Sequence, residues 1–125
     1  MSTAAFSTTS ATPDGLIGAN ADLLVHESIT LISGQNCLRG TVLGKITASG
    51  KYNKSLSAAV DGSETPVAVL AEDCDASGGD KVTVAYFRGD FRADKLILGT
   101  AHTLASIKAG LRTLNIEIVN VQGGV

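Results

Sequence analysis

Aromatic residues are scarce in this sequence, which has no tryptophan, three Phe and two Tyr among its 125 residues. The hydrophobic core must therefore be built from Val, Leu, Ile and Ala. Proline is also scarce, with two residues, whereas glycine is abundant, with 14. This balance favours tight turns between short strands over a long disordered linker. A chain of this length suits one domain, and it can bury enough surface to need no metal or disulfide for stability.

The chain also lacks an excess of charge of one sign and any long hydrophobic run. Its formal net charge is −2 and its ten basic residues are scattered, so we expect no nucleic-acid partner. No run of about 18 apolar residues is present, so we expect no membrane partner. The N-terminal residues have neither a basic n-region nor an apolar h-region, so we expect no secretory signal.

Cysteine is limited to Cys37 and Cys74, which have neither CxxC spacing nor a nearby histidine. We expect both to be small, buried or half-buried thiols. A disulfide between them is the less favoured alternative, because the chain looks cytosolic in origin and disulfides are rare in that compartment.

No arrangement of residues typical of catalysis is present. The two histidines, His26 and His102, belong to no metal-binding motif, and we expect each to have an ordinary structural role. There is no G-x-S-x-G elbow and no glycine-rich phosphate loop. We therefore predict that the protein is not an enzyme and has no catalytic residue, no metal and no cofactor. The alternative of a small hydrolase would require a histidine beside a serine or a carboxylate.

Two short motifs have ordinary explanations. Four carboxylates lie close together in the sequence: Glu72, Asp73, Asp75 and Asp80. Their spacing is not that of a calcium-binding EF-hand, so we interpret the segment as a solvated turn. Arg88-Gly89-Asp90 matches an integrin-binding tripeptide, but nothing indicates secretion, and we interpret it as a turn between two strands.

The hydrophobic pattern predicts strands over residues 22–33, 40–50, 66–73, 81–91, 95–99 and 116–121. Gly44, in the middle of the second of these, indicates a bulge or a close backbone approach. Turns or loops are expected over residues 34–40, 51–66 and 74–81.

One helix is predicted near the C-terminus. Apolar residues recur there at spacings of three and four: Leu104, Ile107, Leu111 and Leu114. Thr103 or Thr100 would cap its start. Asn115 would take the left-handed conformation that ends a helix.

Residues 1–20 differ in composition from the rest of the chain. Ser, Thr and Ala dominate, Phe6 is the only aromatic side chain, and the first charge is Asp14. Such a segment buries too little apolar surface to fold alone. We predict an arm over residues 1–20 that becomes ordered on a partner, and a single β-rich domain over residues 21–125. A plain disordered tail is the alternative for the arm.

Three segments in the middle of the chain form a recognisable pattern. They are GQNCLRGTVLGKIT with GKY, then VAVLAEDCDA, then VAYFRGDF, in that order. Their key residues are Gly40, Leu43, Gly44, Leu70, Glu72, Asp73, Arg88, Gly89 and Phe91. This pattern, over about residues 34–121, resembles the head decoration proteins that tailed bacteriophages add to the outside of their capsids. The sequence departs from that family at Cys74, where Val is expected, and at Asp90, where Glu is common.

The resemblance implies a mainly β fold of the β-clip type, with a bent hairpin ribbon, a small partial barrel, and a short C-terminal helix followed by a strand. It implies a capsid decoration, or cement, protein that binds as homotrimers at local three-fold axes of the expanded head. There it would hold the major capsid proteins of the same phage together against internal DNA pressure. The protein would be made in the host bacterial cytoplasm and lie on the outer surface of the virion.

The resemblance also implies that the arm docks on the capsid as a strand added to a loop or a sheet edge. The residues expected to make this contact are Ser2, Thr3, Ala4, Ala5, Phe6, Ser7, Thr8, Thr9 and Ser10. The alternative function is a surface-displayed module that binds a host or a carbohydrate. The shortage of Tyr and Trp argues against it, because sugars usually stack on aromatic rings.

Overall fold

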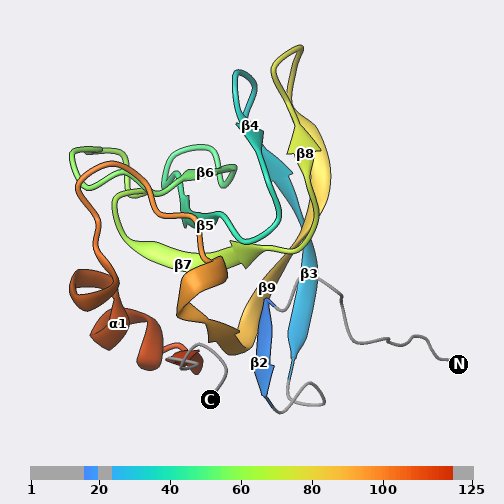
Figure 1. Cartoon of the computed structure of the whole chain (residues 1–125). Coiled ribbons are helices and arrows are strands. Elements are labelled where there is room, and N and C mark those ends of the chain that lie inside the picture. Colours follow the sequence, from blue (N-terminus) through green and yellow to red (C-terminus); the bar gives the residue numbers. More distant parts are fainter. Residues whose placement is uncertain (1–15, 20–23, 120–125) are drawn as a thin grey trace, which may run out of the picture.

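The computed structural model describes residues 16–19 and 24–119 of the chain. Most of its elements are strands, and the C-terminal helix is followed by a strand, as the sequence predicts (Figure 1). In chain order the elements are β2 (Ile17–Ala19), β3 (Val25–Leu31), β4 (Asn36–Cys37), β5 (Val42–Lys45), β6 (Tyr52–Lys54), β7 (Pro66–Leu70), β8 (Cys74–Asp75), β9 (Lys81–Arg92), the 3-10 helix η2 (Ala93–Lys95), α1 (Leu104–Arg112) and β10 (Ile116–Val119).

Five strands form a small partial barrel. They pair in the order β9-β3-β6-β5-β7, and β7 pairs in turn with β9. The closure is incomplete, because β3 meets β6 at one residue pair, Leu31 with Tyr52. β4 and β8 form a separate two-stranded ribbon beside the barrel (Figure 1). The prediction of a mainly β fold with a small partial barrel is confirmed.

The longest strand, β9, changes its neighbours part-way along its length. Its first part pairs with β3 as far as Arg88, and from Gly89 onward it pairs with β10. The predicted turn at Arg88-Gly89-Asp90 is therefore wrong. Gly89 donates a backbone hydrogen bond to the carbonyl oxygen of Asn115 (3.1 Å), so the chain acquires a new partner there instead of reversing. Gly89 has φ +146°, a conformation that favours glycine.

Two hydrophobic clusters make up the core. The first fills the barrel and the β4–β8 ribbon: Ile29, Leu31, Cys37, Leu43, Tyr52, Ala68, Leu70, Cys74, Ala76 and Ala85. The second lies between the sheet and α1: Leu16, Val42, Val69, Phe91, Ala93, Ile107, Leu111, Ile116 and Ile118. Cys37 and Cys74 are free thiols inside the first cluster, which confirms the expectation of buried thiols.

Strand β7 lies between the two clusters. Ala68 and Leu70 contribute to the first and Val69 to the second. In β5, Leu43 belongs to the first cluster and Val42 to the second. Because both faces of these strands are buried, their sequences are continuous apolar runs without alternation.

Gly44 brings the backbone of β5 close to another segment. The register between β5 and β7 shifts between Leu43 and Gly44. A Cβ at position 44 would overlap the carbonyl oxygen of Ser63, which is itself fully buried. The expectation of a bulge or a close backbone approach is confirmed by the close approach to Ser63, which accompanies an irregularity in the β5–β7 register.

Helix α1 has the predicted start, but it ends at Arg112, so the predicted place of Leu114 on its apolar face is wrong. Ser106 donates its backbone N–H to the Thr103 hydroxyl (3.1 Å), and Thr103 donates its own N–H to the Ser106 hydroxyl (2.9 Å), so the two residues form a capping box. Asn115 has φ +65°, as expected after a helix. Leu114, 41% exposed, lies beyond the last turn and outside the buried face. No helix within the described ranges is long and apolar enough to cross a membrane.

Four other local predictions need correction. Residues 95–99 do not form a strand: η2 covers their start, and Ile97 makes an isolated bridge to Thr41. The predicted turns over residues 34–40 and 74–81 contain β4 and β8, which pair with each other. The predicted turn over residues 51–66 contains β6. These strands have two or three residues each, too few to show a periodic pattern.

We predict that Gly44→Ala destabilises the fold by about 2–3 kcal/mol, because the added methyl group overlaps the buried Ser63 backbone. Chemical denaturation of both proteins measures this difference. Gly78→Ala is the matched control, since residue 78 is exposed and the methyl group added there would meet no atom within 4 Å. Equal losses in the two variants would contradict the close approach.

Candidate functional site

The predicted arm is described only at its end. Residues 2–10, the predicted capsid contacts, lie outside the described residues. Leu16 is 1% exposed in the second cluster, and its carbonyl oxygen accepts the backbone N–H of Arg92 (2.8 Å). Strand β2 then pairs with β9, with Ile17 opposite Phe91. This part of the segment is therefore packed and hydrogen-bonded to the body.

Arg39 connects the three motif segments. Its Nη1 donates to the carbonyl oxygen of Ala71 (2.6 Å) and to the hydroxyl of Tyr86 (3.1 Å). Its guanidinium carbon lies 5.6 Å from the centroid of the Tyr86 ring, within cation–π range. Its backbone N–H donates to Asp73 Oδ1 (2.7 Å). The second segment contributes Ala71 and Asp73 and the third Tyr86, so the three segments meet at one residue.

Most of the other motif residues lie inside the fold. Gly40 has φ +98°, and a Cβ there would lie 2.6 Å from the carbonyl oxygen of Lys95. Glu72 Oε2 accepts a hydrogen bond from the Thr83 hydroxyl (3.0 Å). The fully buried motif side chains are Leu43, Leu70 and Phe91. The exposed motif residues are Glu72, Asp73 and Arg88.

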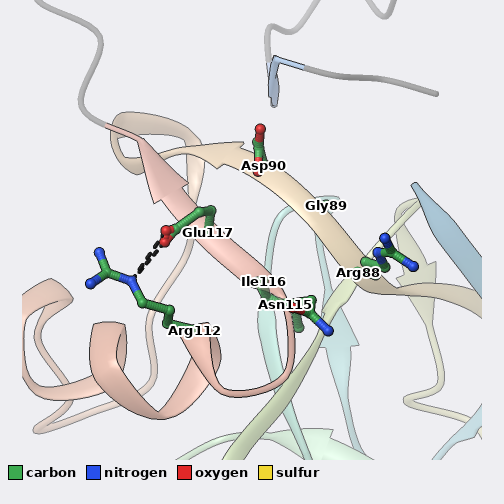
Figure 2. A pocket seen from close by; sticks show the side chains of 7 residues that line it. All are labelled: Arg88, Gly89, Asp90, Arg112, Asn115, Ile116 and Glu117. Atoms are coloured by element: carbon green, nitrogen blue, oxygen red, sulfur yellow. Dashed lines mark hydrogen bonds and ion pairs between the residues drawn. The ribbon is translucent and has the colours of Figure 1, made fainter. Parts of the chain in front are cut away.

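The Arg88-Gly89-Asp90 segment borders a shallow pocket shared with the end of α1 and with β10. Figure 2 shows Arg112 and Glu117 pointing toward each other, and Arg112 Nε donates to Glu117 Oε2 (2.8 Å). Arg88 and Asp90 point away from each other along β9 (Figure 2). An adhesion peptide needs its tripeptide on an exposed tip, whereas here it lies within a paired strand.

His102 lies close to Ser55, the proximity that a hydrolase would require. His102 Nε2 is 3.2 Å from Ser55 Oγ and 3.0 Å from the carbonyl oxygen of Glu64. A carbonyl oxygen only accepts hydrogen bonds, so Nε2 carries the proton and cannot act as the base for Ser55. Ser55 is also fully buried, which keeps substrate away. The contact connects the three loops that contain Ser55, Glu64 and His102. The sequence has no signal for it, because the partners are 47 and 38 residues apart.

Each carboxylate of the segment from Glu72 to Asp80 has its own partner. Asp75 Oδ1 accepts from the Ser77 hydroxyl (2.6 Å) and backbone (3.0 Å), and these bonds lower its pKa. Asp80 accepts from Lys51 Nζ (2.5 Å) and from the Ser33 backbone (2.8 Å), which lowers its pKa as well. Within the described part of the chain, no three His, Cys, Asp or Glu side chains are grouped as metal ligands would be.

A comparison with protein-family models finds one described as bacteriophage lambda head decoration protein D, which matches residues 5–118. The chain belongs to this family. The matched range begins within the predicted arm and ends in β10, so it spans nearly the whole chain. A comparison with individually curated proteins gives no match. The family membership confirms the resemblance of the three segments that meet at Arg39.

In this head decoration protein we predict that Arg39→Met lowers the free energy of unfolding by about 1–3 kcal/mol. The substitution keeps an unbranched stem but leaves the Ala71 carbonyl and the Tyr86 hydroxyl without their charged donor. Arg112→Met is the control: it removes an exposed ion pair and should cost about 0.5 kcal/mol or less. Urea unfolding measures both. A smaller loss for Arg39→Met than for Arg112→Met would rule out the linking role.

Asp80 should make the stability of this decoration protein depend on pH. The bonds from Lys51 and Ser33 lower the folded-state pKa of Asp80, so its carboxylate stabilises the fold above the unfolded-state pKa of about 4. That contribution is lost as pH falls through the lowered folded-state pKa. We expect the thermal midpoint of Asp80→Asn to fall less between pH 5 and pH 2 than that of the original protein. Lys51→Met should reduce the slope similarly, whereas parallel pH curves would contradict the assignment.

Proposed function

We propose that this protein is a non-enzymatic capsid cement protein. It binds as homotrimers at local three-fold axes on the outside of the expanded phage head and stabilises the head against internal DNA pressure. The observation that carries the proposal is the family match over residues 5–118. The partners are two further copies of the chain and the major capsid protein of the same phage. The protein is made in the host bacterial cytoplasm and acts on the outer surface of the virion.

The proposal divides the chain into an arm, residues 1–20, and a β-rich body, residues 21–125. The arm binds by adding a strand to a capsid loop or sheet edge, which needs backbone hydrogen bonds and little side-chain specificity. This suits residues 2–10, which are Ser, Thr and Ala apart from Phe6. The burial of Leu16 and the pairing of β2 with β9 support this proposal, because a force applied to the arm would act on residues that are packed against the body.

A trimer strengthens such an attachment. It presents three arms, and once one has docked, the second and third bind at a high effective concentration. Weak contacts by each arm therefore sum to firm attachment. Each arm also loses conformational entropy when it docks, which limits binding to surfaces that provide a complete partner edge.

The family-motif residues have a structural role in this proposal. Leu43, Leu70 and Phe91 are fully buried and cannot contact a capsid without unfolding. In this proposal the pairings of β3 with β9 and of β4 with β8 supply the strands of the β-clip. The alternative of a carbohydrate-binding module gains no support, because the aromatic rings of the described residues pack into the two clusters.

Deleting residues 2–12 should leave a soluble, folded trimer that no longer binds expanded capsids. The deletion removes the proposed added strand but keeps Leu16 and β2. Sedimentation gives the oligomeric state, and co-sedimentation with undecorated expanded capsids gives binding. Val60→Ser, at a 96% exposed site on the body, is the control and should bind normally. Retained binding by the truncated trimer would remove the arm from the mechanism.

A further inference from the structure

The two cysteines of the chain lie directly opposite each other in the β4–β8 ribbon. The register pairs Cys37 with Cys74, although they are far apart in the sequence. Both belong to the first hydrophobic cluster, as expected for side chains on the same face of an antiparallel pair. β4 and β8 stand side by side at the top of Figure 1.

The backbone geometry is compatible with a covalent bond between them. Opposite residues of antiparallel strands have Cα atoms about 4.5–5.5 Å apart, and disulfides span Cα separations of about 4.4–6.8 Å. We infer that Cys37 and Cys74 are a modification site: two thiols under reducing conditions, and one intramolecular disulfide after reaction with a small peroxide. This inference goes beyond the proposed function and does not depend on it, because it concerns the body alone.

The reaction balances with hydrogen peroxide as the oxidant. The thiolate of one cysteine attacks a peroxide oxygen, the O–O bond breaks, and hydroxide leaves as a sulfenic acid forms. The sulfur of the second cysteine attacks this sulfenic sulfur, the S–S bond forms, and the sulfenic oxygen leaves as water. In total, two thiols and one hydrogen peroxide give one disulfide and two water molecules.

The surroundings of the pair favour a small oxidant. Cys37 and Cys74 are 4% and 6% exposed, so a bulky disulfide reagent has little access to either sulfur. Burial raises the pKa of the Cys37 thiol, the neighbouring Cys74 raises it further, and Lys54 partly opposes them, so the thiolate is scarce near neutral pH. The ribbon has two residue pairs, so few hydrogen bonds must break for a local opening that admits peroxide.

The disulfide would close a loop of the chain that contains three of the five barrel strands. Between the cysteines lie β5, β6 and β7, which contribute to both clusters. Closing a loop of roughly 40 residues lowers the conformational entropy of the unfolded chain. A protein that passes from reducing to oxidising conditions would thereby become more stable without a change of fold.

The test uses the full-length protein, treated with hydrogen peroxide at mildly alkaline pH. We expect the thiols titratable after denaturation to fall from two to none, with an intact mass about 2 Da lower and a peptide linking residues 37 and 74. The thermal midpoint should rise by roughly 10 °C and return after reduction. In a second experiment, the denatured chain is refolded in the presence of oxidised glutathione. Because both thiols are exposed in the denatured chain, burial does not limit the reaction, and the same folded disulfide form should result.

Cys74→Val is the matched control, because Val is an apolar side chain of similar size that fills the buried site but carries no thiol. The variant should fold, and peroxide should give it neither an internal link nor a higher midpoint. The inference is overturned if both thiols survive peroxide and refolding. It is overturned equally if the product is a sulfinic acid or a linked dimer, or if the internal disulfide does not raise the midpoint.

Discussion

Strand β9 is hydrogen-bonded to four other strands, and both hydrophobic clusters are assembled along it. Ala85 contributes to the barrel cluster, and Phe91 contributes to the cluster beneath α1. Gly89 marks the point where β9 exchanges β3 for β10. Because side chains alternate along a strand, a shift of register in β9 would displace the residues of both clusters together. The pairing of this one strand therefore constrains the barrel, the helix and β2.

The scarcity of aromatic residues is offset by strands that contribute side chains to both hydrophobic clusters. A small chain with few aromatic rings gains burial by placing β5 and β7 between two mostly aliphatic clusters. The loops around the barrel are held mainly by polar contacts. Ser63 is fully buried and donates its hydroxyl to Asp61 (2.6 Å), while Ser55 meets His102. These bonds satisfy polar groups that would otherwise be costly to bury.

The proposed division between an arm and a packed body bears on the proposed function. The family motif describes the body, since its segments meet at Arg39 and its large apolar residues are buried. A motif of this kind identifies the fold without marking the surface that binds the capsid. The proposed capsid contact lies in residues 2–10, where backbone pairing demands little of individual side chains. In this proposal, the burial of Leu16 joins the arm to the body.

The amino-acid sequence was enough to determine several features: the mainly β class, the capped start of helix α1, the left-handed conformation of Asn115, the irregularity at Gly44 and the burial of the two cysteines. Each depends on a residue's intrinsic preference or on a periodic pattern within one element. The tertiary structure alone decided the rest. Arg88-Gly89-Asp90 has a typical turn composition, yet it continues a strand because β10, more than 20 residues away, supplies its hydrogen bonds. The links of Arg39 to Tyr86, of His102 to Ser55 and of Cys37 to Cys74 likewise join distant segments. No local pattern encodes them, because they form only when the barrel closes.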